Sequence, residues 1–409
     1  MAKPVAVTGM GVVTPVGSSV EEFHRAVWEG RSGVGELDGE PLGLSGPWFA
    51  AEVRDFVPDR WLTRREAQRL DRAGQMCVAA VHQALEASRL LPGEAGRETG
   101  AAIGLALGTA FGNAHNVQRT YFDFFSRRSL SVHSVPGCMP HSAAAAAGIR
   151  FDLTGPSFTV STACSSGAVA VGLAFEMVRN GLKGPIVAGG CDATLTSVHL
   201  ENWRSMKVLA SCSGQPGRAV RPFSRDREGF VLGEGAAVVV LEDMESAMRR
   251  GAPILGEVLG YACTSDATHL TAPSAQGQAK ALEGALASAG IRSEDVDYVN
   301  AHGTATPLND CTETAALRQV FGERLPPVSS IKAATGHMLG ASSAAELVAC
   351  VLAVSTGVVP PTINYTVPDP ECDVDPVAEG CRDVGARIAV SNAFAFGGNN
   401  AVLVVRRHE

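Results

Sequence analysis

Charged and aromatic residues are scarce in this sequence of 409 residues: charged residues make up 19% of it and aromatic residues 6%, against 45% hydrophobic residues. Scarce charge beside abundant apolar residues excludes a disordered or fibrous chain and indicates a compact protein with a large core. Basic residues are outnumbered by acidic ones, 34 to 42, which gives a net charge of −8. This balance disfavours nucleic acid as a partner.

Several sequence signatures are also missing. None of the 10 cysteines forms a C-x-x-C pair, so we interpret them as reduced thiols of a cytoplasmic protein, mostly small core residues. No apolar run approaches the ~18 residues of a membrane span, and no targeting segment precedes the first apolar stretch. The phosphate-binding and H-E-x-x-H motifs are absent, and Gly9-Met10-Gly11 lacks the third glycine of a dinucleotide-binding turn. We therefore expect no cofactor.

Short apolar runs alternate with segments of helical periodicity along the chain. Residues 5–8 are predicted to form a strand that ends in a glycine turn at residues 9–11, and residues 66–88 a helix broken at Gly74. The pattern restarts after residue 250. Buried strands that alternate with helices predict an α/β protein with covered sheets. We divide it into two halves, residues 1–250 and 251–409.

One cysteine differs from the others in its surroundings. Cys164 lies in the small-residue frame Ser161-Thr162-Ala163-Cys164-Ser165-Ser166-Gly167, between a predicted strand and a predicted helix. Its thiol would then lie near the unsatisfied N–H groups and the positive dipole end of the helix, which should lower its pKa. We predict that Cys164 is a nucleophile; the alternative is a buried structural cysteine.

Two histidines lie in similar frames. His302 stands in Asn300-Ala301-His302-Gly303-Thr304 and His337 in Thr335-Gly336-His337-Met338, and each follows a predicted strand. The strand, turn and apolar helix around His337 repeat those around Cys164, as expected of a duplicated fold. A thiol with two imidazoles and no acid in the frames suits the stabilisation of a thioester enolate better than hydrolysis. A zinc site would lack its fourth ligand, so we expect no metal there.

Two charged residues, Lys332 and Glu346, flank His337 within apolar or small-residue stretches. A charge that is buried alone is costly, so we expect them to interact with each other or with the histidines. The functional alternative is that they orient His337 and tune it electrostatically.

Near the C-terminus, Gly397 and Gly398 permit a turn between two predicted strands that exposes backbone N–H groups. One of these groups, together with the N–H of Cys164, would form an oxyanion hole. Phe394 and Phe396 could line or gate an apolar tunnel.

With these frames in place, the chain resembles the β-ketoacyl-acyl carrier protein synthases of the thiolase superfamily, in the elongating group with a Cys-His-His triad. The segments that carry the resemblance run in order over the whole chain: residues 5–17, Gly155-Pro156-Ser157, Ala188-Gly189-Gly190, Arg221-Pro222-Phe223, residues 226–235, Ser265-Asp266-Ala267 and Pro360-Pro361-Thr362-Ile363-Asn364. The resemblance implies a five-layer α-β-α-β-α fold made of two similar halves, usually dimeric.

The resemblance also implies a reaction. Cys164 takes an acyl chain from a carrier protein while the N–H groups of Cys164 and Phe396 hold the oxyanion. His302 and His337 then stabilise the enolate that malonyl-carrier protein leaves on losing CO₂, and this enolate attacks the Cys164 thioester. The supporting and substrate-contacting residues expected with them are Lys332, Glu346, Thr304, Thr306, Phe394, Phe396, Gly397, Gly398 and Thr109. Some relatives bind a monovalent cation at positions matching Asn300, Ala301, Glu346, Ser391 and Asn392.

An acidic acyl carrier protein is the implied partner. Arg65, Arg69 and Arg72 fall at i, i+4 and i+7, on one face of the predicted helix, and Lys207 extends this docking patch. The alternative is a solvated helix face, partly neutralised by neighbouring acids.

Two pathways stay open within the family. Ala395 and Asn399 depart from the common fatty-acid pattern, and residues 368–375 resemble ketosynthases of dissociated polyketide systems. We therefore favour a stand-alone polyketide or polyene ketosynthase, as a homodimer or a heterodimer with a chain-length-factor paralogue, over a synthase of fatty-acid elongation. A non-catalytic chain-length factor is disfavoured because it would lack Cys164, and a degradative thiolase because residues 391–400 contain no second cysteine.

Overall fold

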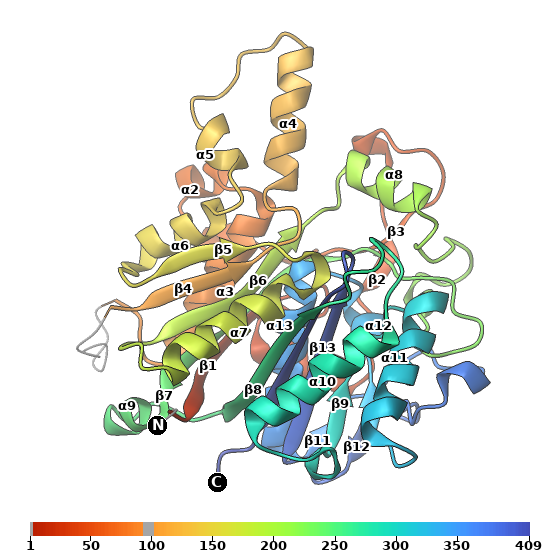
Figure 1. Cartoon of the computed structure of the whole chain (residues 1–409). Helices are drawn as coiled ribbons and strands as arrows, with labels where there is room; N and C mark the ends of the chain where they lie inside the picture. Colours follow the sequence, from red (N-terminus) through yellow and green to blue (C-terminus); the bar gives the residue numbers. More distant parts are fainter. Residues whose placement is uncertain (1–2, 93–101) are drawn as a thin grey trace.

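The computed structural model describes residues 3–92 and 102–409. A ten-stranded hydrogen-bonded sheet forms its centre (Figure 1). It consists of two five-stranded parts with the same strand order, which we call the first sheet and the second sheet. The strands of the first sheet are β1 (Val5–Val13), β4 (Gly104–Gly108), β5 (Ser157–Val160), β6 (Ile186–Ala193) and β7 (Glu234–Asp243). Those of the second are β8 (Gly256–Ser265), β9 (Tyr298–Asn300), β10 (Val328–Ser329), β13 (Ile388–Ala395) and β14 (Asn399–Arg406).

The two sheets repeat one topology. Each runs from its third strand through its second, fourth and fifth to its first. In each, the third, second and fourth strands are parallel, and the fifth is antiparallel to both of its neighbours. A short antiparallel pairing of β1 with β8 joins the sheets. Identical order and direction in both sheets are what a duplicated fold requires.

Helices cover both sheets and separate them, which gives five layers. On the outer face of the first sheet, α3 (Arg72–Ala87) packs against β1, β6 and β7. Between the sheets, α7 (Ser166–Arg179) and α13 (Gly340–Thr356) contact each other and strands of both sheets. On the other outer face, α10 (Ala275–Ala289) packs on β8 and β14, and α11 (Pro307–Phe321) packs on α10. The predicted five-layer α/β fold is confirmed.

Burial explains why these segments lack the usual polar alternation. Every residue of β1, β6 and β7 is buried, because helices lie on both faces of the first sheet. The central helix α13 is apolar nearly all round, since sheets lie on both of its sides.

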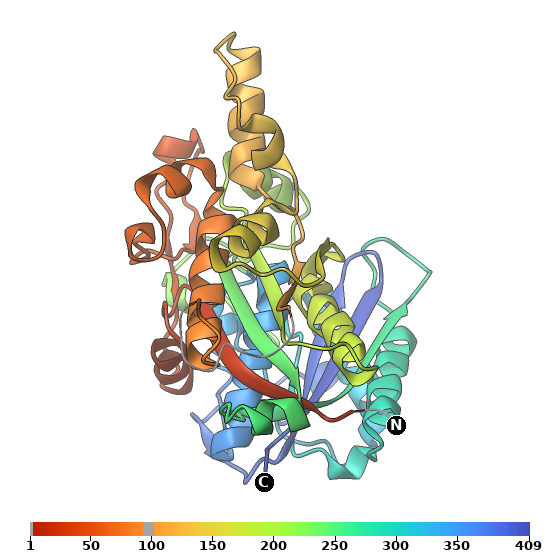
Figure 2. The same cartoon turned by 90° about the vertical axis from the view of Figure 1, so that its left-hand side faces the viewer.

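The remaining elements surround this body. The other helices are α1 (Val20–Trp28), α2 (Arg64–Arg69), α4 (Ala114–Phe125), α5 (Ser134–Cys138), α6 (Ser142–Phe151), α8 (Ser197–Ser205), α9 (Met244–Arg249) and α12 (Lys332–Thr335). Two small sheets pair β2 (Val34–Glu36) with β3 (Phe49–Ala51) and β11 (Val358–Val359) with β12 (Arg382–Asp383). Short 3₁₀ turns are η1 (Glu40–Leu42), η2 (Pro58–Arg60), η3 (Ala163–Ser165), η4 (Pro216–Arg218), η5 (Ser293–Asp295) and η6 (Pro370–Cys372). Figure 2 shows α4 and α5 projecting away from the layered body. Within the described ranges, no helix is both long and apolar enough to span a membrane.

The expected glycine turn after the first strand is wrong, because β1 continues without a break from Val5 to Val13. Gly9 and Gly11 lie where α3 touches the strand. A Cβ at Gly9 would come within 2.2 Å of the Ala84 carbonyl oxygen, and one at Gly11 within 1.9 Å of the Ala80 carbonyl oxygen. These glycines therefore allow the helix to approach the strand closely.

The helical segment predicted over residues 66–88 is interrupted, but not at the expected residue. It consists of α2 and α3, separated at Leu70, whose backbone is extended. The side chain of Asp71 accepts the N–H of Ala73 and so caps the start of α3. The expected break at Gly74 does not occur, because this residue lies inside α3.

Candidate active site

A strained turn presents Cys164 between β5 and α7. The residue lies in η3, directly before the first turn of α7, and only 6% of it is exposed. The preceding residue, Ala163, has a φ of +52°, a left-handed conformation that costs energy for any residue with a Cβ. The hydroxyls of Ser165 and Ser166 hold the turn by donating to the carbonyl oxygens of Thr162 and Ala163.

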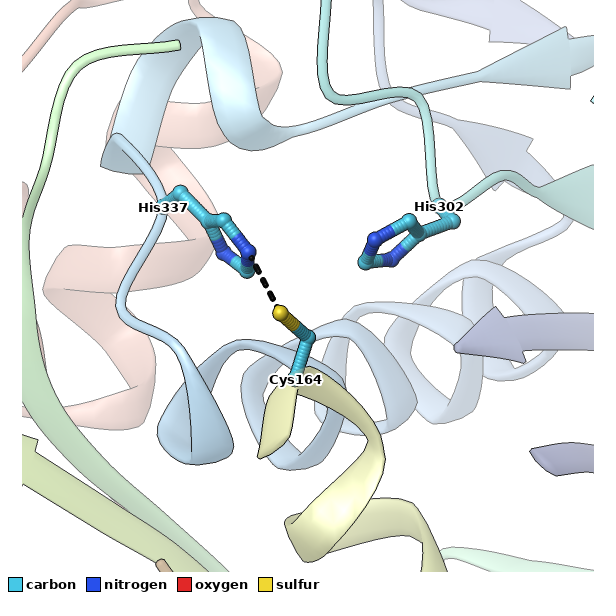
Figure 3. A group of neighbouring side chains, drawn as sticks. All are labelled: Cys164, His302 and His337. Atoms are coloured by element: carbon cyan, nitrogen blue, oxygen red, sulfur yellow. Dashed lines mark hydrogen bonds between the residues drawn. The ribbon is translucent and has the colours of Figure 1, made fainter. Parts of the chain in front are cut away.

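His337 lies in direct contact with the thiol. Its Nε2 is 3.1 Å from Cys164 Sγ (Figure 3), and its Nδ1 is 3.1 Å from Ser342 Oγ at the start of α13. The same Ser342 hydroxyl accepts the N–H of Met338. Burial, and then the positive charge of Lys332, lower the pKa of His337 well below its usual value, so the ring is neutral at pH 7.

His302 approaches the sulfur from the second half of the chain. It follows β9, and its ring meets that of His337 edge-on, with 5.7 Å between the two ring centroids (Figure 3). Lys332 Nζ lies 3.3 Å from His302 Nδ1 and 2.5 Å from the His302 carbonyl oxygen, and it also bonds Glu346. Because an ammonium only donates, Nδ1 accepts and the ring proton sits on Nε2. Burial, Lys332 and His337 all lower the pKa of His302 well below its usual value.

Two buried carboxylates that were missed at the sequence level hold the loops of the site. Glu313 of α11 accepts the backbone N–H groups of His302 and Gly303, each at 2.8 Å. Asp192, at the end of β6, accepts the N–H groups of Ala110, Phe111 and Gly340 and the hydroxyl of Thr109. A signal for Asp192 existed in the sequence, because its charge ends an otherwise apolar strand.

The predicted low pKa of Cys164 is wrong. Burial raises the pKa of its thiol to about 12, although Lys332 and the backbone N–H groups of Phe396 and Cys164 act in the opposite direction. Loss of solvent around the sulfur therefore outweighs the charge of Lys332 and these two hydrogen bonds. The backbone N–H groups of Phe396 and Cys164 lower this pKa by hydrogen bonding to the sulfur. Two N–H groups directed at the sulfur are the arrangement expected of an oxyanion hole.

A cavity of about 410 Å³ opens onto the three residues. Of the residues predicted from the sequence, it is lined by Cys164, His302, His337, Thr304, Thr306, Phe394, Phe396, Gly398 and Lys207. Trp203 of α8, which sequence reasoning missed, also lines it and stacks on Phe396 with ring centroids 5.9 Å apart. This stack holds one wall of the cavity beside the thiol.

Two predicted substrate contacts do not line this cavity. Thr109 is buried, and its hydroxyl donates to Asp192 and accepts the N–H of Gly112, so it supports a loop instead. Gly397 is exposed, and its N–H donates to the Leu270 carbonyl oxygen.

Several residues of the expected cation site leave buried side-chain oxygens unsatisfied. Asn300 Oδ1, Glu346 Oε2 and Asn392 Oδ1 are all buried without a hydrogen-bond partner. Asn300 pairs with Ser391 across β9 and β13, next to Asn392. Unpaired buried oxygens are costly, and a cation would satisfy them.

Arg65 and Arg69 are exposed on α2, and Lys207 is exposed at the cavity mouth. Arg72 does not belong to this patch, because its guanidinium bonds the buried Glu234 and the Val53 carbonyl oxygen. Asp71 starts a new helix before Arg72, so the i, i+7 spacing from Arg65 no longer places the two on one helix face.

Comparison with known proteins agrees with this geometry. Residues 2–247 match the family described as "Beta-ketoacyl synthase, N-terminal domain", and residues 255–366 match "Beta-ketoacyl synthase, C-terminal domain". The chain is 38% identical to a 3-oxoacyl-[acyl-carrier-protein] synthase 2 of Synechocystis sp., over 100% of this chain and 99% of that protein. It is 40% identical to Nodulation protein E of Rhizobium meliloti, over the full length of both.

Solved structures are similar over the whole chain as well. A structure titled "The ishigamide ketosynthase/chain length factor" matches with a TM-score of 0.92 and 34% identity, and covers 100% of both chains. A beta-ketoacyl synthase from Burkholderia phymatum matches with a TM-score of 0.92 and 33% identity, again over 100% of both chains. A polyketide ketosynthase in complex with its acyl-carrier protein matches with a TM-score of 0.90 and 30% identity over 100% of both chains.

Proposed function

Because this chain belongs to the beta-ketoacyl synthase family, whose members are acyltransferases that form carbon–carbon bonds, we propose that it acts as a stand-alone polyketide or polyene ketosynthase. It would condense an acyl chain held on Cys164 with malonyl-acyl carrier protein, giving a 3-oxoacyl-carrier protein and CO₂. The observation that carries this proposal is the contact of Cys164 Sγ with His337 Nε2, with His302 across the same cavity.

Acyl transfer comes first in the proposed mechanism. The Cys164 thiol passes its proton to His337 Nε2 as the sulfur attacks the thioester carbonyl carbon. The N–H groups of Cys164 and Phe396 stabilise the oxyanion. The carrier thiolate leaves and takes the proton from His337, so the protein ends with a Cys164 thioester and a neutral ring.

Decarboxylation follows with malonyl-carrier protein in the cavity. The Nε2 protons of His302 and His337 bond the malonyl thioester oxygen, the bond to the carboxylate breaks, and CO₂ leaves behind an enolate. The enolate carbon attacks the Cys164 thioester and expels the sulfur. Ser342 can accept from Nδ1 of His337 or donate to it, so Nε2 of this ring can accept in the first step and donate in the second.

Two supporting groups complete the proposed site. Lys332 and Glu346 hold His302 and set its tautomer. A monovalent cation would satisfy the buried oxygens of Asn300, Glu346 and Asn392 that have no hydrogen-bond partner, and would stiffen the strands behind the histidines.

The preference for polyketide chemistry is supported by its structural relatives, whose titles name a ketosynthase/chain length factor and a type II polyketide system. Asn399, one of the residues that depart from the common fatty-acid pattern, accepts a hydrogen bond from Ser165 at 2.8 Å. This residue therefore contacts the turn that carries Cys164. The alternative, fatty-acid elongation, is favoured by the name of the Synechocystis relative. A chain-length factor without catalysis is disfavoured by the presence of Cys164.

An acidic acyl carrier protein is the proposed partner, docking on Arg65 and Arg69 with Lys207 at the cavity mouth. Dimerisation, with a second copy or a chain-length-factor paralogue, is supported by the edge position of β5 in its sheet. It is also supported by the exposed apolar side chains of the projecting α4–α5 region: Tyr121, Phe122, Phe124, Phe125, Val132 and Val135. The repeated topology supports a division into domains at residues 1–250 and 251–409.

The test uses the purified chain and acyl-carrier thioesters. Wild type should gain the acyl mass on Cys164 and, with malonyl-carrier protein, release CO₂ and a 3-oxoacyl product, whereas Cys164→Ala should do neither. A comparison of polyene-type unsaturated acyl chains with saturated chains then separates the pathways. No acylation in the presence or absence of a paralogous subunit would overturn the condensing role, and a clear preference for saturated chains would overturn the polyketide role.

A further inference from the structure

A second pair of sulfurs lies outside the active site. Cys311, in the first half of α11, and Cys372, at the end of η6, have their Sγ atoms 3.6 Å apart. Cys311 is half-buried, whereas Cys372 is only 1% exposed. Neither takes part in the chemistry assigned to Cys164, so one accessible and one sheltered thiol face each other with no role in condensation.

A fixed cation lies against the accessible sulfur. Arg227 Nη2 is 2.9 Å from Cys311 Sγ and 3.1 Å from the Pro307 carbonyl oxygen. Its Nη1 bonds the Ser224 carbonyl oxygen and the Asp369 carboxylate. The guanidinium is thus held in place by other oxygens, and a positive charge beside a sulfur favours its thiolate form.

The two thiols have different parts in this contact. Burial raises the pKa of Cys311, while the hydrogen bond from Cys372 and the charge of Arg227 act against that rise. Burial raises the pKa of Cys372 well above its usual value; the charge of Arg227 acts against this rise, and the contact with Cys311 adds to it. Because Cys311 is the more exposed sulfur and the one that Arg227 contacts directly, it is the sulfur that a peroxide reaches first.

We propose that Cys311 and Cys372 form a redox-active thiol pair that closes to a disulfide when a peroxide reaches Cys311. The Cys311 thiolate attacks one peroxide oxygen, the O–O bond breaks, and a sulfenic acid forms while hydroxide leaves. Cys372 then attacks the sulfenic sulfur, the S–O bond breaks, and its thiol proton leaves with the oxygen as water. The hydroxide takes up the proton that Cys311 lost on forming the thiolate, so two thiols are oxidised to a disulfide and one hydrogen peroxide is reduced to two waters.

The arrangement favours a disulfide over a metal site. Cys311, Cys372 and Asp369 have ligand atoms within 4.8 Å of one another. However, Asp369 is already bonded to Arg227, whose fixed positive charge would lie beside any metal cation. Such a charge opposes a divalent ion but assists a thiolate.

The closed bond would tie α11 to η6. Helix α11 also carries Glu313, whose carboxylate accepts the backbone N–H groups of His302 and Gly303. The modification site is therefore linked through one helix to a loop of the active site.

Other cysteines offer a built-in comparison. Cys77 and Cys191 also interact, but both are buried, so a peroxide should not oxidise them in the folded protein.

Cys164 contacts His337 and would itself react with peroxide, so the test is made on the Cys164→Ala variant. The full-length variant is treated with a small excess of hydrogen peroxide, its free thiols are alkylated, and its intact mass and proteolytic peptides are measured.

We expect a loss of two hydrogens, two fewer alkylated thiols and a peptide that links Cys311 to Cys372, all reversed by dithiothreitol. Adding Cys372→Ser should leave a sulfenic acid on Cys311 that dimedone traps, and adding Cys311→Ser should abolish both products. Wild-type protein whose Cys164 has first been acylated should give the same link, which guards against a misfolded variant. The proposal is overturned if both thiols stay alkylatable after peroxide, if the link joins other cysteines, or if the purified chain holds zinc that protects both thiols.

Discussion

Lys332 Nζ lies 3.3 Å from His302 Nδ1, and its other two N–H groups bond the His302 carbonyl oxygen and Glu346. All three donors of the ammonium are therefore used. This contact gives His302 its Nε2–H tautomer, and the same charge lowers the pKa values of both histidines and of Cys164. One buried ammonium thus lowers the pKa values of all three catalytic side chains.

Replacing Lys332 separates its catalytic from its structural role. Lys332→Met should lower malonyl decarboxylation by about 10²–10³-fold, because His302 loses its fixed tautomer. It should also lower the free energy of unfolding by about 3 kcal/mol, because Glu346 is left buried without its partner. The matched control, Lys332→Met with Glu346→Gln, should recover stability in denaturant titrations without recovering decarboxylation. Equal recovery of both would show that Lys332 is only structural.

The two histidines should differ in acyl transfer. His337 alone has a hydrogen-bond contact with Cys164 Sγ among the described side chains. His337→Ala should therefore slow acylation of Cys164 by about 10²-fold, whereas His302→Ala should leave it within about tenfold of wild type. Both variants should lose decarboxylation. Acylation is followed by protein mass and decarboxylation by release of labelled CO₂; the reverse order of the acylation rates would contradict the assignment.

Alkylation of Cys164 should become faster as pH rises, without levelling off near neutrality. A thiol pKa of about 12 means that the thiolate fraction increases throughout the range below that value. The rate of inactivation by iodoacetamide, measured from pH 6 to pH 10, checks this, with Cys164→Ala as the control for other thiols. A plateau at pH 7 to 8 would mean that the helix dipole outweighs burial.

Asp192 should impose a pH dependence on stability. Burial raises the pKa of its carboxyl from 3.8 to about 6 in the folded state. Between pH 4 and 6 the folded protein therefore holds more protons than the unfolded chain. The contribution of the protonated Asp192 to stability is present below pH 4 and is lost as pH rises through 6. Asp192→Asn should remove this slope from the free energy of unfolding. It should also cost about 1–3 kcal/mol at pH 7, because the amide cannot accept all four hydrogen bonds.

An exposed carboxylate provides the comparison for Asp192. Asp59 is exposed on η2, so Asp59→Asn should leave the pH profile of unfolding unchanged. The interpretation fails if both variants retain the wild-type slope between pH 4 and 6.

Reversal of charge on α2 should weaken the use of carrier-bound substrates. Arg65→Glu with Arg69→Glu should raise KM for acyl-carrier protein by about tenfold with little change in kcat, since the exposed charges act on encounter. The effect should shrink in high salt. Arg324→Glu, a change at an exposed arginine beyond α11, is the control. An unchanged KM in the double variant would exclude docking on α2.

The sequence by itself determined the reactive group and the general fold. Small-residue frames after predicted strands marked Cys164, His302 and His337, because a reactive side chain at a strand end needs a tight turn and room for a substrate. Apolar strands alternating with helices identified the covered sheets, and the second series after residue 250 indicated the duplication. These are local features, set by residues that are neighbours in the chain.

The tertiary structure decided what depends on distant residues. It placed His337 against the Cys164 thiol and Lys332 against His302. It also brought Glu313 and Asp192 to the loops of the site. Thr109 and Arg72 make structural hydrogen bonds to buried carboxylates. It also reversed the expected shift in the pKa of Cys164. Burial and contacts between side chains of different elements decide these properties. The loss of water around a buried thiol raises its pKa, and burial depends on the whole fold, so no pattern in a single segment predicts it.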